Sequence, residues 1–156
     1  MTPTNLTIQH LYRTPEHIRM VAEWIYSEFW TDKPEMTPEI LEGYLRNAVN
    51  DTAIPQSLLA FRDGKPVGTV NLIENDDDQR THLRPWLAAL LVLPEYRNGG
   101  IGAELVKECV ACAKRVGETQ LFLGTHIPAY YEALGWRIHE QVHDTHWVMV
   151  FDLIAE

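Results

Sequence analysis

Apolar residues in the first third of the chain recur three and four positions apart, the spacing of a helix that buries one face. This pattern predicts a helix over residues 15–30 and a second one over 37–50. Each begins with Thr-Pro, and Thr14 and Thr37 are suitable N-caps because proline is well accommodated at the first helical position. The stripe that the first helix is expected to bury consists of Ile18, Val21, Ala22, Ile25 and Phe29.

In the second third of the chain the period changes from that of helices to that of strands. Residues 57–73 predict two strands joined by a turn at Asp63-Gly64, a common hairpin sequence. The polar stretch 74–85 is expected to form a long loop. Residues 86–93, WLAALLVL, are continuously apolar, which predicts a strand buried on both faces in the middle of a sheet.

The remaining elements complete a mixed α/β pattern. The order along the chain is strand, two helices, three strands, helix, strand, helix and two strands. This order predicts one α/β domain over residues 1–156, with a central sheet that has helices on both faces. The further helices are expected at 101–117 and 128–136, and the further strands at 6–12, 119–125, 136–141 and 146–153, the last two as an antiparallel pair at the sheet edge.

Composition and charge narrow the class of protein. The chain has 156 residues, of which 46% are hydrophobic and 22% charged, as expected of one packed globular domain. No apolar run approaches the ~18 residues of a membrane span, and the N-terminus lacks a signal-peptide pattern, so a cytoplasmic protein with no membrane partner is expected. The formal charge of −9, with no basic stripe, argues against a nucleic-acid partner and fits a cationic substrate better.

Two pairs of residues have spacings that could indicate metal or redox chemistry. Cys109 and Cys112 form a C-x-x-C pair, but they lie well inside the helix predicted at 101–117, so we expect them to pack in the core. His143 and His146 lie in a loop without a third convergent ligand. No metal is therefore expected.

The segment RNGGIG at residues 97–102 joins the buried strand to the next helix. A Walker loop would need Lys-Ser or Lys-Thr in place of Ala103 and Glu104, and a dinucleotide fingerprint would need glycine at Leu105. The remaining interpretation is a glycine turn whose backbone N–H groups and helix N-terminus bind a pyrophosphate, with Arg97 adding a charged contact. A plain glycine turn between strand and helix is the alternative.

With its flanking residues this loop resembles motif A of the GNAT family of N-acetyltransferases. The stretch LLVLPEYRNGGIGAELV, residues 90–106, is similar to the family's pattern, and YYEALGW, residues 130–136, is similar to its second signature. The resemblance implies a mixed, mostly antiparallel sheet that is splayed between residues 86–93 and 119–125, and acetyl-CoA as cosubstrate. The implied cofactor-binding residues are Leu90, Leu91 and Val92 along the pantetheine arm, Arg97, Asn98, Gly99, Gly100, Ile101 and Gly102 around the pyrophosphate, and Tyr130 packing nearby.

The resemblance also implies a reaction, direct transfer of an acetyl group in a ternary complex to the primary amine of a small molecule or a peptide N-terminus. Tyr131 matches the family's frequent general acid, the alternative being an aromatic residue that packs on the cofactor or core. Glu74 is similar in placement to a carboxylate that some members use as base, the alternative being a solvated residue at the end of a strand.

The acceptor side and the assembly are less specified by the sequence. The resemblance implies that the end of the first helix, which carries Trp24, Phe29 and Trp30, helps to wall the acceptor pocket. Trp30 is the better candidate for this wall, since core packing is the simpler account of Trp24. His82 and His126 are candidates beside the same cleft, each with a surface histidine as the alternative. Family members often form homodimers. The competing function is a non-catalytic acyl-CoA-binding module, which would keep RNGGIG but would not depend on Tyr131.

Overall fold

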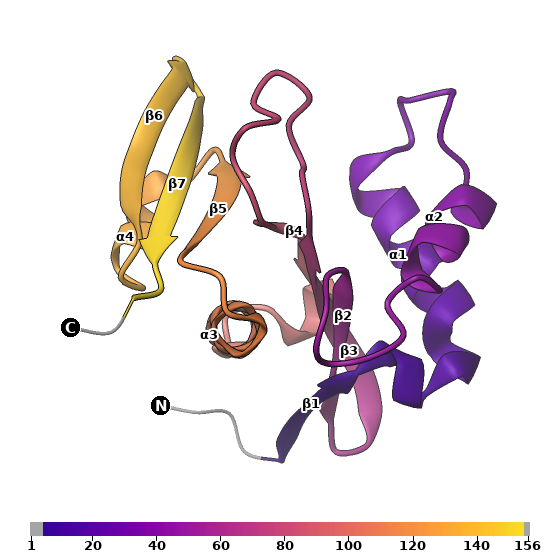
Figure 1. The fold of residues 1–156 in the computed structure, drawn as a ribbon. Coiled ribbons are helices and arrows are strands. Elements are labelled where there is room, and N and C mark those ends of the chain that lie inside the picture. The colour runs from indigo at the N-terminus through magenta and orange to yellow at the C-terminus, as the bar shows by residue number, and fades with distance from the viewer. Residues whose placement is uncertain (1–4, 155–156) are drawn as a thin grey trace.

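Seven strands form one open sheet, in the order β1-β2-β3-β4-β5-β7-β6. The computed structural model describes residues 5–154, and Figure 1 shows its helices and strands. Neighbouring strands are antiparallel except β4 and β5, which are parallel. The strands are β1 (Leu6–His10), β2 (Gln56–Arg62), β3 (Lys65–Ile73), β4 (Trp86–Val92), β5 (Gln120–Thr125), β6 (Arg137–His143) and β7 (His146–Asp152).

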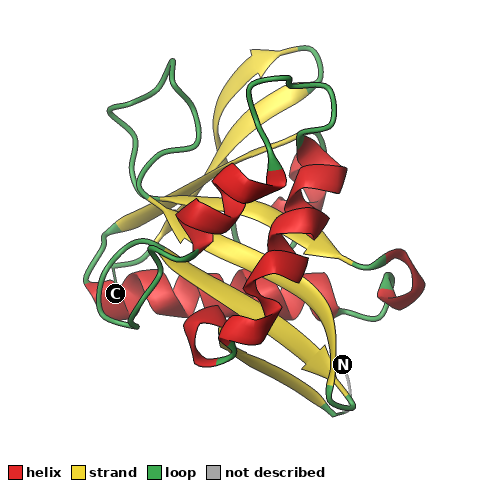
Figure 2. Cartoon of the chain, turned by 90° about the vertical axis from the view of Figure 1, so that its right-hand side faces the viewer, coloured by secondary structure: helices red, strands yellow, loops and turns green. Residues whose placement is uncertain are grey.

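Helices cover both faces of this sheet. Figure 2 shows α1 and α2 in front of the strands and α3 behind them. Buried residues of α3 and of the sheet form one apolar cluster, which Tyr131 and Trp136 join, and α1 and α2 form a second cluster on the opposite face. The mixed, mostly antiparallel fold expected from the sequence is confirmed. The helices are α1 (Ile18–Phe29), α2 (Pro38–Leu45), α3 (Ile101–Val116) and α4 (Pro128–Glu132).

The two parallel strands at the centre of the sheet pair only near their beginnings. Trp86 of β4 lies opposite Phe122 of β5, and within residues 5–154 no other residue pair joins these strands. Beyond this pair the strands diverge (Figure 1). The splayed sheet is therefore confirmed, and backbone groups in the second half of β4 have no strand partner on the β5 side.

The two Thr-Pro sequences begin their helices differently. Thr37 caps α2 as predicted, since its hydroxyl accepts a hydrogen bond of 3.1 Å from the backbone N–H of Ile40. The hydroxyl of Thr14 donates instead to a carbonyl of the preceding turn, and Pro15–His17 form a 3-10 turn before α1 starts at Ile18. The prediction of Thr14 as the N-cap of the first long helix is wrong because two short 3-10 turns separate β1 from α1.

The hairpin turn and the positions of both cysteines agree with the sequence. Asp63 and Gly64 have positive φ angles of 51° and 80°, as the tight turn between β2 and β3 requires. Cys109 and Cys112 are free and buried in α3, where burial raises the pKa of both thiols. Packing in the core, predicted for this pair, is confirmed.

One member of the predicted stripe of α1 does not reach the core. The first four residues of the stripe are buried, but Phe29, in the last turn of the helix, is 43% exposed. Periodicity correctly places Phe29 on the same face as the others. Its burial is not achieved because this turn of α1 extends beside the divergent part of the sheet.

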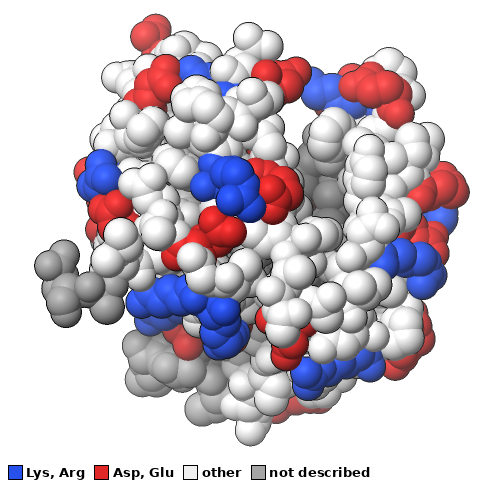
Figure 3. Space-filling model, viewed as in Figure 1, with Lys and Arg blue, Asp and Glu red and all other residues white. Residues whose placement is uncertain are grey.

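Charges on the surface are mixed in sign. On the face seen in Figure 3, acidic and basic side chains lie interspersed over the surface. Arg80, for example, bridges the loop after β3 to β6 through a 2.7 Å contact with Glu140. Among residues 5–154 no helix has the length and apolar character needed to cross a bilayer.

Gly68 offers a test of how tightly β3 supports the end of β4. A Cβ at this position would lie 2.9 Å from the carbonyl oxygen of Leu91 and 3.1 Å from Leu105 Cδ1. We expect Gly68→Ala to lower the free energy of unfolding by about 1–3 kcal/mol, because backbone must shift to admit the methyl group. The control is Gly43→Ala at an exposed position of α2, where the added Cβ has no atom within 4 Å.

Urea unfolding of the two variants measures both effects. Gly43→Ala should raise stability by about 0.5–1 kcal/mol, because alanine loses less conformational freedom in a helix than glycine does. Equal shifts of the same sign in both variants would contradict close packing of Gly68 against β4.

Candidate active site

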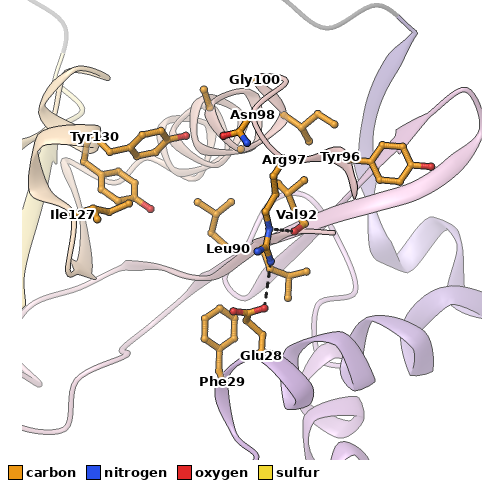
Figure 4. Close-up of a pocket in the computed structure, with 15 residues that line it drawn as sticks. Glu28, Phe29, Leu90, Val92, Tyr96, Arg97, Asn98, Gly100, Ile127 and Tyr130 are labelled. Atoms are coloured by element: carbon orange, nitrogen blue, oxygen red, sulfur yellow. Dashed lines mark hydrogen bonds and ion pairs between the residues drawn. The ribbon is translucent and has the colours of Figure 1, made fainter. Parts of the chain in front are cut away.

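A cavity of about 540 Å³ lies where β4 and β5 separate. Its volume is typical of a site for a small ligand or cofactor. Five parts of the chain contribute to its wall, namely the last turn of α1, the second half of β4, the loop leading into α3, the first turn of α3, and α4 with the residue before it (Figure 4). The lining residues are Glu28, Phe29, Leu90, Leu91, Val92, Tyr96, Arg97, Asn98, Gly100, Ile101, Gly102, Ala103, Ile127, Tyr130 and Tyr131.

Strand β4 carries a bulge at the cavity. Asn71 and Thr69 of β3 lie opposite Ala88 and Leu91 of β4, so two residues fall between the paired positions on β4 and only one on β3. Ala89 takes up the extra length with a φ of 51°, a left-handed conformation that is uncommon for a residue with a Cβ. The bulge turns the backbone of Leu90 and its neighbours relative to the rest of the strand.

The loop after β4 ends at the N-terminus of α3 and leaves it open. Gly100 is the N-cap, with a φ of 86° and no side-chain capping hydrogen bond. The first backbone N–H groups of α3 have no acceptor within the helix, and the positive end of the helix dipole lies here. A Cβ added to Gly102 would lie 3.3 Å from the hydroxyl of Tyr130, so glycine keeps this wall uncrowded. The arrangement suits an anion such as a pyrophosphate.

Arg97 and Glu28 are the two charged residues among those lining the cavity. Arg97 Nε donates a 2.8 Å hydrogen bond to the carbonyl oxygen of Val92, and Arg97 Nη2 lies 3.5 Å from Glu28 Oε1. Figure 4 shows the guanidinium group extending from the loop toward the end of α1. The side chains of Arg97 and Glu28 are each 47% exposed, so water competes for both.

Tyr131 is the most enclosed phenol of the cavity, 8% exposed. Its ring packs edge-on against Tyr130, with centroids 5.0 Å apart, and against Trp136, with centroids 6.1 Å apart. Burial, and secondarily the neighbouring Tyr130, raises the pKa of Tyr131 to about 12. The phenol is therefore a hydrogen-bond donor at neutral pH and keeps its proton until a strong acceptor appears.

The structure brings most of the predicted cofactor residues together. Leu90, Leu91, Val92, the loop residues and Tyr130 line the cavity, and Tyr131 lies with them. Gly99 is the exception, since it is not part of the lining. The nearest atoms to a Cβ at Gly99 would be Arg62 Nη1 and the carbonyl oxygen of Tyr96, both at 3.7 Å.

The structure does not bring the predicted base to this cavity. Glu74 pairs with Arg84, with contacts of 2.8 Å and 2.9 Å between the guanidinium and carboxylate groups. Hydrogen bonding to Arg84 lowers the pKa of Glu74, which makes the carboxylate a weaker base. Neither residue lines the cavity.

The three predicted acceptor residues also lie outside the cavity lining. Trp30 packs against the apolar cluster of α1 and α2, and His82 is exposed in the loop after β3. His126 contacts the carbonyl oxygen of Thr145, and its ring lies 5.3 Å from that of His146. Among residues 5–154 no set of three or more His, Cys, Asp and Glu side chains is arranged to hold a metal ion.

Five lining residues were not predicted from the sequence. Tyr96 and Ala103 immediately flank the predicted loop, and extending that segment by one residue at each end would have included them. Ile127 precedes α4 and carries no distinctive signal. The last two, Glu28 and Phe29, lie nearly seventy positions before the loop. The family resemblance implied that this end of the first helix helps to wall the acceptor pocket, but the candidate chosen there was Trp30.

Comparisons with solved structures agree with this architecture. The acetyltransferase yncA from Salmonella typhimurium, determined with its cofactor acetyl-CoA, has a TM-score of 0.71 and 15% identity, over 98% of this chain and 96% of that one. A GNAT-family acetyltransferase from Staphylococcus aureus Mu50 has a TM-score of 0.68 and 21% identity, over 96% and 99% of the two chains. An aminoglycoside 6'-N-acetyltransferase complexed with coenzyme A has a TM-score of 0.68 and 16% identity, over 96% and 98%.

At these identities the structural likeness establishes the fold. No curated protein matches the sequence significantly. The family model of the acetyltransferase (GNAT) family matches residues 20–136, which include the end of α1, the bulged strand, the glycine loop and the tyrosine pair of α4. This chain belongs to the GNAT acetyltransferase family.

Proposed function

We propose that this protein is an acetyl-CoA-dependent N-acetyltransferase that moves an acetyl group directly to the primary amine of a small molecule or a peptide N-terminus. The observation that carries the proposal is that one cavity contains three features. These are the open N-terminus of α3 at Gly100, which suits an anion, a bulged strand with unpaired backbone groups, and the buried phenol of Tyr131. Family membership supports acyl transfer in general. Two structures with the same fold, determined with acetyl-CoA or coenzyme A, support the cosubstrate.

The residues of the cavity fit acetyl-CoA. The uncapped N-terminus of α3 and the glycines at Gly100 and Gly102 would receive the pyrophosphate, with Arg97 turning toward the same group. The strand backbone from Leu90 to Val92 would receive the pantetheine arm, since β5 does not occupy this side of β4. When bound, acetyl-CoA supplies a thioester as the acyl donor.

The residues of the chain would then orient and polarise the reacting groups. Backbone N–H groups beside the bulge at Ala89 would donate to the thioester oxygen, where negative charge develops. Tyr131 would donate its phenolic proton to the departing sulfur. The low-polarity surroundings that raise the pKa of Tyr131 keep the phenol protonated at neutral pH, so that its proton is available when the sulfur departs.

The proton of the amine needs another acceptor. Glu74 does not line the cavity, and its pairing with Arg84 disfavours it as the base. Both cysteines are buried inside α3 with raised thiol pKa values, so neither is suited to form a covalent acyl intermediate. Release of the amine proton to water and direct transfer in a ternary complex are the steps that these positions support.

Titration calorimetry tests the cosubstrate. Acetyl-CoA should bind with a micromolar dissociation constant, and ATP and NAD should bind far more weakly. Gly100→Ala should weaken acetyl-CoA binding about tenfold, because a residue with a Cβ is strained at a φ of 86° and the backbone at the start of α3 would have to change conformation. Gly64→Ala is the matched control, with a similar φ of 80° in the remote β2–β3 turn. Binding of ATP or NAD in place of acetyl-CoA would refute the proposal.

Steady-state kinetics test the role of Tyr131. Tyr131→Phe should lower kcat about a hundredfold, because the departing sulfur loses its proton donor. The dissociation constant of acetyl-CoA should change less than about threefold, since the phenyl ring keeps the packing against Tyr130 and Trp136. Unchanged turnover would exclude the acid role, and no turnover of any amine by the wild type would favour the binding-module alternative.

Alkaline titration tests the environment of Tyr131. Its pKa is raised from the ordinary 10.0 to about 12, so the folded state keeps a proton that the unfolded chain releases. The free energy of unfolding should therefore fall as pH rises from about 10 to about 12, and this part of the fall should be absent in Tyr131→Phe. Absorbance of phenolate, wild type minus Tyr131→Phe, measures the ionisation directly. A difference midpoint near pH 10 would contradict the buried environment.

A further inference from the structure

The charged pair inside the cavity raises a question that the proposed function does not answer. Arg97 and Glu28 are the two ionic side chains of the lining, and in the described structure they contact each other. An anionic cosubstrate that needs Arg97 must therefore compete with Glu28. Glu28 comes from α1 and Arg97 from the loop before α3, so their contact joins two walls of the cavity (Figure 4).

The contact between Arg97 and Glu28 is weak enough for Arg97 to leave Glu28 for another anion. It is a single contact of 3.5 Å, and each side chain is 47% exposed. Exposed pairs of this geometry contribute little to stability. A pyrophosphate offers several charged oxygens to the same guanidinium group and forms stronger, charge-assisted hydrogen bonds. Arg97 is therefore expected to leave Glu28 when the cosubstrate binds.

Loss of Arg97 leaves Glu28 without a counter-ion in the cavity. Phe29 and the residues of β4 that share the lining with Glu28 are apolar. The side chain of Glu28 is 47% exposed, so water hydrates the freed carboxylate, and a cationic ligand that enters the cavity meets an unpaired anion there. Among the described lining residues Arg97 is the sole cation, so any new cationic partner of Glu28 would come from a ligand.

Glu28 is well placed to hold that ligand beside the reacting groups. Figure 4 shows Leu90, from the bulged part of β4, lying between Glu28 and Phe29 on one side and Ile127 and Tyr130 on the other. An ammonium group at Glu28 would thus lie against the strand that is proposed to receive the acyl donor.

We infer that Glu28 is the acceptor-binding carboxylate of this enzyme, held by Arg97 until the cosubstrate pyrophosphate displaces it, and that it then binds an ammonium group of the acceptor. The inference rests on the proposed function and deepens it by assigning the acceptor class, a cationic amine. Because coupling between two ligands is reciprocal, the amine must in turn strengthen acetyl-CoA binding. Glu28 is a binding residue and takes no part in bond formation. Where the ammonium group that it holds is also the nucleophile, that group loses its proton to water before it attacks the thioester.

The test compares Glu28→Gln with Glu23→Gln. Glu23 lies on the same helix but pairs with Arg19 at 3.1 Å and does not line the cavity. Without amine, Glu28→Gln should bind acetyl-CoA about two- to fivefold more tightly than the wild type, because the competing carboxylate is gone. Glu23→Gln should match the wild type. Calorimetry gives both dissociation constants.

The second part of the test measures the steady-state kinetics of acetylation with three amine probes. The probes are butane-1,4-diamine, 2-phenylethylamine and a tripeptide with a free N-terminus. For the probe with the highest kcat/KM in the wild type, Glu28→Gln should raise the amine KM about tenfold and change kcat less than about threefold. A general loss of structure would weaken the binding of both acetyl-CoA and the amine. Tighter binding of acetyl-CoA together with weaker binding of the amine is expected only if Arg97 exchanges Glu28 for the cosubstrate.

The outcomes separate this inference from the proposal beneath it. A wild type that binds no acetyl-CoA, or acetylates none of the probes, overturns the proposed function and the role of Glu28 with it. A wild type that binds acetyl-CoA and acetylates a probe upholds the proposed function. In that case a Glu28→Gln variant with unchanged or weaker acetyl-CoA binding, or with an unchanged amine KM, overturns the role of Glu28 alone.

Discussion

The separation of β4 from β5 is the constraint on which the site depends. A parallel pair at the centre of a sheet would ordinarily satisfy the backbone groups of both strands along their length. Here the pairing stops after Trp86 and Phe122, and the second half of β4 becomes an inner edge of the sheet. The loop and α3 follow directly from the end of this edge. The open end of α3, the unpaired strand and the tyrosines of α4 consequently meet in one cavity.

Two local departures from regular backbone shape that cavity. The left-handed conformation of Ala89 costs about 1 kcal/mol, and the regular pairing of β3 and β4 on either side of the bulge holds it in place. The second departure is Gly100, where a positive φ carries no such cost because glycine has no Cβ. The first departure turns the strand backbone, and the second aims the start of α3 at the same space.

The distribution of charge shows why the net charge of −9 says little about the site. Several carboxylates around the loop after β3 are already matched, Glu74 by Arg84, and Asp77 and Glu140 by Arg80. Inside the cavity one cation and one anion face each other. Binding of an anionic cosubstrate at Arg97 would change this local balance, and the proposed charge of the acceptor follows from the local balance and not from the net charge.

The sequence by itself determined the elements, their order and the glycine loop that we propose binds an anion. Helix and strand periods follow from local backbone geometry, and the glycines of residues 97–102 limit their own conformations, so both signals can be read without the fold. Proximity between distant segments is a different kind of information. Glu74, His82 and His126 carry suitable chemical groups, yet the folded chain places them outside the cavity lining. Glu28 gave no signal of a site, and Phe29 was named only as one of the residues that close the first helix. Both line the cavity because the last turn of α1 lies beside the divergent end of β4. Only tertiary packing decides where a helix ends relative to a sheet, since periodicity specifies which residues share a face and not what that face meets.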